Sequence, residues 1–141
     1  MFIQSLMTPR PYTIPVGAPL VDALLIMRKE GVRHLPVVDD DKLVGILSDR
    51  DILLRITPAL GEQPDTDAEP LLLLVEEVMT PSPITVRETD DVAYVTDVMI
   101  SERIGAIPVV DQVGAVRGIV STVDLMVELA RRLKAGARTT V

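Results

Sequence analysis

Two stretches of the chain carry apolar residues three or four positions apart, the spacing of an amphipathic helix. The first runs over residues 19–30, where Pro19 favours the first turn and Gly31 favours the end. The second begins near Asp90, a suitable N-cap. The two apolar stripes consist of Leu20, Ala23, Leu24 and Met27, and of Val92, Val95 and Met99.

Short runs of β-branched and aliphatic residues predict strands before and after each of these helices. One strand precedes each helix, and two strands follow it as a hairpin. A second helix then begins at Ser48 and, in the other half, at Ser121. The order in each half is strand, helix, strand, strand, helix. The predicted strands are residues 12–15, 35–38 and 43–47 in the first half, and 84–87, 107–110 and 116–120 in the second.

The two halves are copies of one unit. The motif Met-Thr-Pro at residues 7–9 returns 72 positions later at residues 79–81, and Pro-Val-Val-Asp at 36–39 returns at 108–111. After one inserted residue, Gly-Ile-Leu-Ser at 45–48 returns as Gly-Ile-Val-Ser. Collinear matches over about forty-five positions indicate an internal duplication.

This duplication predicts an α/β fold of the α+β kind, with two βαββα units. A unit of about fifty residues buries too little surface to fold alone, so we expect the two to pack sheet to sheet. Residues 57–70, rich in Pro, Gly and acidic residues, predict an exposed loop. We expect a short helix or strand at 71–78 and a frayed end at 134–141. The expected divisions are 1–56 for the first repeat, 57–77 for a linker, 78–135 for the second repeat and 136–141 for a tail.

Composition narrows the function. Aromatic residues make up 2% of the chain and the net charge is −7, which argues against binding of single-stranded or duplex nucleic acid. The absence of cysteine excludes disulfides, thiol catalysis and cysteine-ligated metals. No apolar run approaches the roughly twenty residues of a spanning helix, and no signal peptide is visible. We therefore expect a cytoplasmic protein without membrane contact.

No catalytic or metal-binding residue set stands out. His34 is the single histidine and lacks the partners that a zinc site needs. The acidic run 39–41 fits a hairpin turn better than a calcium loop, which has a longer ligand spacing. Neither a glycine-rich phosphate loop nor a nucleophile–base pair is present. We expect a protein that is not an enzyme, needs no cofactor and holds no metal.

The duplicated set of Met-Thr-Pro, Pro-Val-Val-Asp and Gly-Ile-Leu-Ser-Asp-Arg-Asp resembles a tandem pair of CBS (cystathionine-β-synthase) domains, a Bateman module of the stand-alone bacterial or archaeal type. The resemblance covers residues 6–133. It implies two βαββα units about a pseudo-two-fold axis, with clefts that bind AMP, ADP, ATP or S-adenosylmethionine. It also implies a homodimer.

Residues where the second hairpin strand of each half turns into a helix are the first binding candidates. Free N–H groups at a helix start favour anions, and a serine hydroxyl there can donate to a phosphate. The resemblance assigns ribose to Asp51 and Asp124. A capping box of the same composition needs no ligand, so capping and binding stay open together. The phosphate candidates here are Ser48, Arg50, Ser121 and Thr122.

A second set is implied by the resemblance alone. The first strand of each repeat, and the residues that begin the hairpin, flank the adenine base in family members. The alternative is that these residues are ordinary strand core. The set consists of Thr13, Ile14, Leu35 and Pro36 in the first repeat, and Thr85, Val86, Ile107 and Pro108 in the second.

A third set of candidates is basic, and its members all belong to the first repeat. Arg33, His34 and Arg50 correspond to uncharged Gly105, Ala106 and Val123 in the second. We hypothesise that a ligand with its ribose on the second-repeat aspartate places its phosphate on these basic groups. The alternative is that both arginines are solvated surface residues.

The expected function is a regulatory module that senses an adenosine-type ligand and relays its occupancy to an unidentified partner protein. Leu125, Leu129 and Leu133 on the last helix would pack in the core or form a dimer contact. The alternative function is a structural or dimerisation scaffold whose clefts have lost their ligand.

Overall fold

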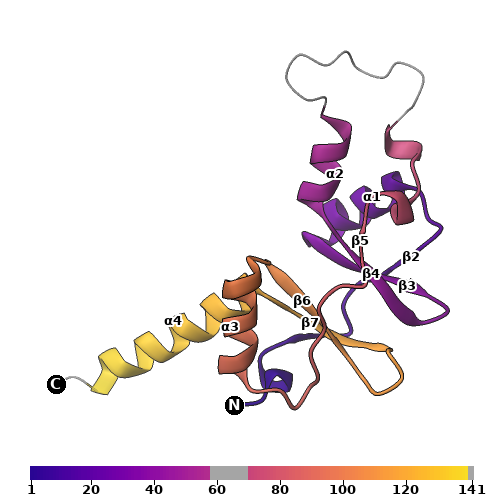
Figure 1. The fold of residues 1–141 in the computed structure, drawn as a ribbon. Helices are drawn as coiled ribbons and strands as arrows, with labels where there is room; N and C mark the ends of the chain where they lie inside the picture. Colours follow the sequence, from indigo (N-terminus) through magenta and orange to yellow (C-terminus); the bar gives the residue numbers. More distant parts are fainter. Residues whose placement is uncertain (58–69, 140–141) are drawn as a thin grey trace. The chain divides into compact units, whose positions relative to one another are not determined.

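The computed structural model describes residues 1–57 and 70–139, and it has the mixed α+β architecture that the sequence predicts (Figure 1). The helices are α1 (Leu20–Glu30), α2 (Asp49–Ile56), α3 (Val92–Glu102) and α4 (Thr122–Thr139). The strands are β1 (Thr8–Pro9), β2 (Ile14–Pro15), β3 (His34–Asp39), β4 (Lys42–Ser48), β5 (Thr80–Pro81), β6 (Ala106–Val110) and β7 (Val116–Ser121). Short 3₁₀ turns are η1 (Ile3–Ser5), η2 (Pro70–Leu72) and η3 (Val75–Glu77).

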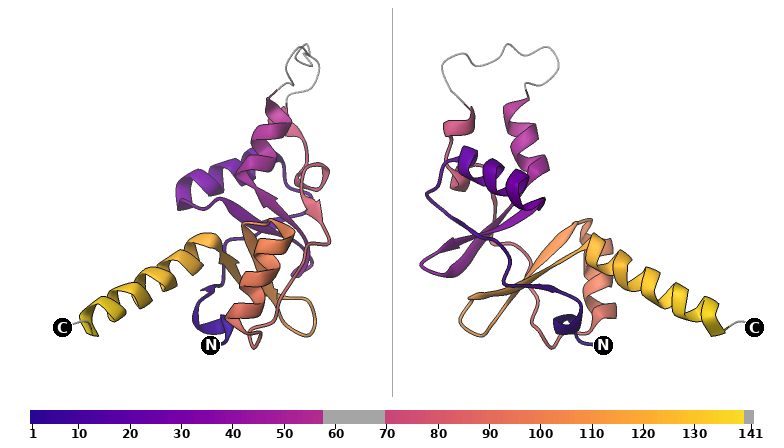
Figure 2. Two further views of the ribbon diagram at one scale, coloured as in Figure 1. Left: turned by 60° about the vertical axis from the view of Figure 1, so that its left-hand side comes forward. Right: turned by 180° about the vertical axis from the view of Figure 1, so that it is seen from behind.

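The chain forms two compact units. One is continuous, Pro11–Pro83, and we call it the inner unit; the other joins Met1–Arg10 to Ile84–Val141, and we call it the outer unit. The inner unit has a four-stranded sheet in the order β2-β3-β4-β5, with α1 and α2 on one side of it (Figure 2). The outer unit has a three-stranded sheet in the order β1-β7-β6, together with α3 and α4. Both predicted hairpins, β3–β4 and β6–β7, are confirmed.

The segments that precede the two repeats are exchanged between the units. Thr8 in β1 lies opposite Ile119 in β7, so the start of the first repeat pairs with the hairpin of the second. Thr80 in β5 lies opposite Ile46 in β4, which is the reciprocal pairing. The compact units therefore do not coincide with the sequence repeats, because each unit contains the Met-Thr-Pro segment of the other repeat.

Glycine allows these short strands to approach the hairpins. A Cβ atom on Gly118 would lie 3.0 Å from the carbonyl oxygen of Thr8 and would collide with the side chain of Met7. A Cβ atom on Gly45 would lie 3.1 Å from the Thr80 carbonyl oxygen and would collide with Met79. Glycine inside a strand often marks a close backbone approach of this kind. Glycine is therefore required at the same position of both hairpins, because a side chain there would collide with the short strand that pairs with the hairpin.

The exchanged segments also supply core residues. Ile3 in η1 and Val75 in η3 occupy equivalent positions in the two repeats, and both side chains are 0% exposed. Ile3 packs in the apolar cluster of the outer unit, with residues such as Val95 and Ile107. Val75 packs in the cluster of the inner unit, with residues such as Leu20 and Leu35. Each unit is therefore completed by an apolar side chain from the other repeat.

Four local expectations need correction or refinement. The strand predicted at residues 84–87 is reduced to one isolated parallel bridge, Val86 opposite Val109. The N-cap of α3 is Asp91 rather than Asp90, whose Oδ2 accepts a hydrogen bond from Arg87 N at 2.8 Å in the preceding turn. The region 71–78 contains 3₁₀ turns and not a strand. Helix α4 continues to Thr139, past the point where fraying was expected. The expected loop falls mostly on residues 58–69, outside the described residues, and Gly31 ends α1 with φ 67°, as predicted.

Candidate functional site

At the start of α2, Ser48 and Asp51 hold each other in a capping box. Ser48 N donates to Asp51 Oδ2 at 2.9 Å, and Asp51 N donates to Ser48 Oγ at 3.0 Å. Both side chains are half-buried. Among the described residues, the other carboxylate oxygen, Asp51 Oδ1, accepts no hydrogen bond. A capping box is therefore present at this pair, and among the described residues it leaves one oxygen of the carboxylate without a donor.

The equivalent pair at the start of α4 has more hydrogen bonds. Ser121 N donates to Asp124 Oδ2 at 2.9 Å, Ser121 Oγ donates to the same oxygen at 3.2 Å, and Asp124 N donates to Ser121 Oγ at 3.3 Å. In addition, Thr8 Oγ1 lies 3.2 Å from Asp124 Oδ1 and donates to it. Both oxygens of Asp124 are thus engaged within the outer unit. Thr8 was not predicted as a site residue, although it belongs to the repeated Met-Thr-Pro motif.

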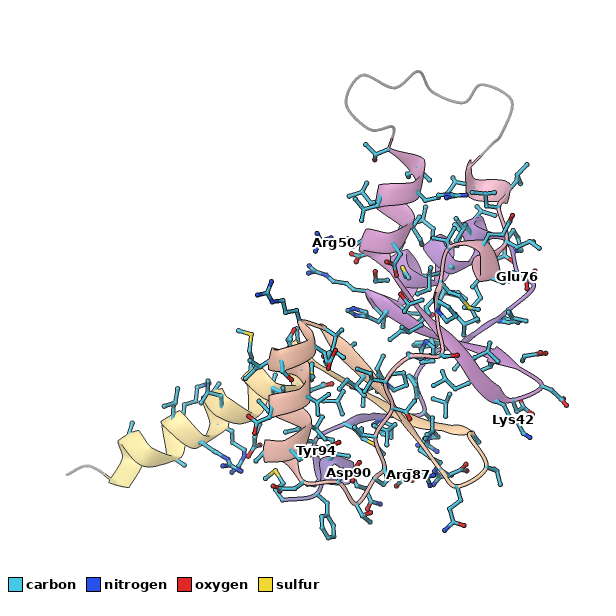
Figure 3. All side chains as sticks on the ribbon, in the orientation of Figure 1. Lys42, Arg50, Glu76, Arg87, Asp90 and Tyr94 are labelled. Atoms are coloured by element: carbon cyan, nitrogen blue, oxygen red, sulfur yellow. The ribbon has the colours of Figure 1, made fainter. Side chains whose placement is uncertain are left out.

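The basic candidates lie at the same end of the inner hairpin as Ser48 and Asp51. His34 begins β3 directly opposite Ser48 in β4, and the Arg33 carbonyl oxygen accepts from Asp49 N at 2.9 Å. Arg50 lies in the first turn of α2 and is exposed (Figure 3). The structure therefore brings three basic residues to one edge of the inner unit, next to the Ser48–Asp51 pair. These residues are Arg33, His34 and Arg50.

The outer unit repeats this backbone arrangement without the charge. Ala106 lies opposite Ser121, and the Gly105 carbonyl oxygen accepts from Thr122 N at 3.0 Å. Thr122 and Val123 are both exposed at the start of α4. The difference in charge between the repeats therefore occurs at structurally equivalent positions.

Burial changes the expected role of His34. It lowers the pKa of the imidazole below its ordinary value of 6.5, while the carboxylates of Asp49 and Asp51 oppose this shift and Arg33 adds to it. The neutral ring is therefore favoured near pH 7. Any phosphate contact from His34 would then be a hydrogen bond from a neutral ring, which leaves the two arginines as the charged groups of this edge.

The lowered pKa predicts a loss of stability in mild acid. Below pH 6.5 the unfolded chain takes up a proton on this residue before the folded chain does, so the free energy of unfolding falls as the pH decreases from about 7 to 5.5. The variant His34→Gln should lose less stability over that interval, as measured by urea unfolding at both pH values. An equal loss in the parent protein and the variant would contradict the assignment to His34.

The base candidates divide into buried and accessible residues. Ile14, Leu35, Val86 and Ile107 are each at most 3% exposed and belong to the two apolar clusters. Pro36 and Pro108 are also buried. Thr13 is half-buried and Thr85 is exposed, so these two threonines are the side chains of the set that remain accessible to a base.

Within residues 1–57 and 70–139, no group of three or more histidine, aspartate or glutamate side chains is arranged to hold a metal ion. Nor is any helix there both long and apolar enough to cross a membrane.

Comparison with known proteins identifies the family. The sequence profile of the CBS domain matches twice, at residues 3–57 and 75–131. The chain is also 32% identical over 129 residues to a CBS domain-containing protein of Dictyostelium discoideum, with 89% of each chain covered. This chain belongs to the CBS domain family and contains a pair of these domains, as the resemblance implied.

Solved structures of the family have the same fold. The CBS domain pair of protein MJ0100, in complex with 5′-methylthioadenosine and S-adenosyl-L-methionine, has a TM-score of 0.78 and 29% identity, covering 92% of this chain and 99% of that one. CBSX2 in complex with AMP, a protein of Arabidopsis thaliana, has a TM-score of 0.76 and 28% identity, covering 94% and 98%.

Some matched relatives are enzymes by name but are much longer. The chain spans 22% of the L-aspartate semialdehyde sulfurtransferase of Methanocaldococcus jannaschii and 23% of the homoserine O-acetyltransferase of Methanohalobium evestigatum. By contrast, it spans 92% of the CBS domain-containing protein YhcV of Bacillus subtilis. The similarity therefore concerns the domain pair and not the remainder of those enzymes.

Proposed function

We propose that the chain is a regulatory module that binds an adenosine-type ligand, namely AMP, ADP, ATP or S-adenosylmethionine, and relays its occupancy to a partner protein. One observation carries the proposal: the same serine–aspartate pair is held at the start of both α2 and α4. An ionised carboxylate has about four acceptor positions, and vicinal ribose hydroxyls need two of them. Similar structures with bound AMP and S-adenosylmethionine support this ligand class.

The helix starts also suit the phosphate of such a ligand. Backbone N–H groups in the first turn and the helix dipole favour an anion there. The Ser48 hydroxyl accepts from Asp51 N and has no hydrogen-bond acceptor among the described residues, so its proton is available to a phosphate oxygen. The hydroxyl of Ser121 instead donates to Asp124.

The charge difference between the repeats favours one ribose aspartate for phosphorylated ligands. We propose that a nucleotide whose ribose lies on Asp124 directs its phosphate to Arg33, His34 and Arg50. A ligand on Asp51 would meet the uncharged counterparts Gly105, Ala106 and Val123 instead. The second position would therefore take an uncharged or cationic tail more readily than a phosphate.

We further propose a homodimer as the assembled form. Helix α4 exposes five large apolar side chains that no described part of the chain covers: Val123, Met126, Val127, Leu129 and Leu133, each more than half exposed. Of the three predicted leucines, Leu125 packs against the outer cluster, which leaves the other two for a contact between copies. An apolar helix face of this extent is typical of an association surface.

A thermal-shift titration tests the binding function against the scaffold alternative. AMP, ADP, ATP and S-adenosylmethionine are each added up to about 100 times their dissociation constant, where a bound ligand raises the melting temperature by several degrees. The double variant Asp51→Ala/Asp124→Ala, which lacks both ribose carboxylates, should show no shift. If none of the four compounds shifts the parent protein, the scaffold alternative is favoured.

A further inference from the structure

The carboxylate of Asp124 is already occupied by a hydroxyl from the other repeat. We propose that Thr8 is a specificity-determining residue of the Asp124 site, because its hydroxyl takes an acceptor position that a ribose needs. This inference rests on the proposed function, since it concerns the affinity of one of the two ribose aspartates. It changes what the duplication implies: two equivalent aspartates are not equally available to a ligand.

The hydrogen bonds at the two aspartates show the difference. Asp124 Oδ2 accepts from both Ser121 N and Ser121 Oγ, which uses its two lone pairs. Asp124 Oδ1 accepts from Thr8 Oγ1, which leaves one lone pair on the whole carboxylate. A ribose that presents both hydroxyls therefore has to displace the Thr8 hydroxyl or turn the Ser121 hydroxyl away.

Among the described residues, donors use one of the roughly four acceptor positions of Asp51. Its Oδ2 accepts from Ser48 N, and among the described residues its Oδ1 accepts from no donor. Thr80 occupies the position in β5 that corresponds to Thr8 in β1, opposite Ile46 instead of Ile119. No hydrogen bond joins Thr80 to Asp51 in the described structure. The two repeats thus have the same backbone arrangement, but a threonine hydroxyl donates to the aspartate only at Asp124 in the described structure.

Backbone pairing fixes where the Thr8 hydroxyl can reach. Thr8 lies opposite Ile119 in β7, two residues before Ser121, and Arg10 N donates to the Arg117 carbonyl oxygen at 3.2 Å. The hydroxyl is therefore held at the end of the strand that leads into α4. Displacing it requires rotation about χ1 rather than movement of the strand, so the hydroxyl competes with a ligand but does not seal the site.

This competition predicts a difference in sugar selectivity. At Asp51, loss of one ribose hydroxyl removes a charge-assisted hydrogen bond. It should therefore weaken binding more strongly there than at Asp124. At Asp124, a ligand with a single hydroxyl can use the remaining lone pair without displacing Thr8. The Asp124 site should therefore tolerate 2′-deoxy-AMP better than the Asp51 site tolerates a ligand with the same deletion.

The test measures AMP affinity by calorimetry in variants that each keep one ribose aspartate. In the Asp51→Ala background, Thr8→Val removes the competing hydroxyl and should tighten AMP binding about two- to tenfold, the usual worth of one net hydrogen bond. It should also increase the loss of affinity caused by 2′-deoxy-AMP. Valine suits a strand and has nearly the shape of threonine, so β1 should be retained. The matched control is Thr80→Val in the Asp124→Ala background, for which no change is expected.

The outcomes separate this inference from the proposed function. Unchanged or weaker AMP binding in Thr8→Val overturns the role of Thr8 while leaving the nucleotide module intact. Equal tightening by Thr80→Val overturns the asymmetry. If Asp51→Ala shows no measurable binding, Thr8→Val should restore it, and failure to do so counts against the inference. No binding of any adenosine compound to the parent protein overturns the proposed function itself.

Discussion

Replacement of Asp124 by alanine is expected to weaken AMP binding by about 30- to 1000-fold, whereas Asp51→Ala should change it little. The expected loss corresponds to about 2–4 kcal/mol, because a hydrogen bond to the free acceptor position of the charged carboxylate is worth about 1.5–3 kcal/mol, and a second one, gained in exchange for the Thr8 hydroxyl, adds about 1 kcal/mol. The difference between the variants follows from the phosphate, which we assign to Arg33 and Arg50 when the ribose lies on Asp124. Calorimetric titration of both variants with AMP measures this difference in affinity.

The two aspartates serve as controls for each other. Each accepts a hydrogen bond from the backbone N–H of its capping serine, so both substitutions remove the same helix-capping contact. Asp124→Ala also removes the hydrogen bonds from Ser121 Oγ and Thr8 Oγ1, so it should lose somewhat more folding stability than Asp51→Ala. The affinities for AMP are therefore compared at a temperature where both variants are folded. The opposite pattern, in which Asp51→Ala abolishes AMP binding and Asp124→Ala does not, would show that the phosphate is assigned to the wrong site.

Replacement of Ile3 by alanine is expected to lower the free energy of unfolding of the outer unit by about 2–5 kcal/mol, the usual cost of such a truncation in a packed core. The Ile3 side chain is 0% exposed and lies in the cluster of the second repeat, although the residue belongs to the first. Backbone hydrogen bonds from Ile3 N to the Asp90 carbonyl oxygen and from Gln4 N to the Glu88 carbonyl oxygen hold η1 in place. Urea unfolding followed by circular dichroism measures the change.

Phe2→Ala provides the matched control for this substitution. Phe2 directly precedes Ile3 and has a larger side chain, but that side chain is 58% exposed. Its truncation should therefore change stability by less than about 0.5 kcal/mol. Similar small effects of both variants would mean that the N-terminal segment does not contribute to the outer core.

Local sequence patterns predicted the elements well because each pattern reports contacts between near neighbours. The apolar stripes of α1 and α3, the two hairpins and the helix starts after Ser48 and Ser121 are all found. The exchange of β1 and β5 was not predicted, since the pairing of Thr8 with Ile119 joins residues far apart in the sequence. Gly118 was a possible indication, because a glycine inside a strand often allows another backbone to approach.

The candidate site shows the same limit. The Ser-x-x-Asp spacing correctly predicted which side chains meet at the helix starts, because residues three apart lie on the same first turn. The contact of Thr8 with Asp124 depends on the exchanged strand and so lay outside a local analysis. Counting His34 among the basic residues also missed its burial, which lowers its pKa.

The exchange of the leading segments sets an order of folding during synthesis. The inner unit is one continuous stretch, Pro11–Pro83, and can assemble once that stretch has left the ribosome. Strand β1 has no partner until β7, about 110 residues later, has emerged, which takes roughly 5 to 20 seconds at ordinary rates of translation. During that interval β1 is an unpaired edge. Its two-residue length and Pro9, which cannot donate a backbone hydrogen bond, limit its pairing with other chains.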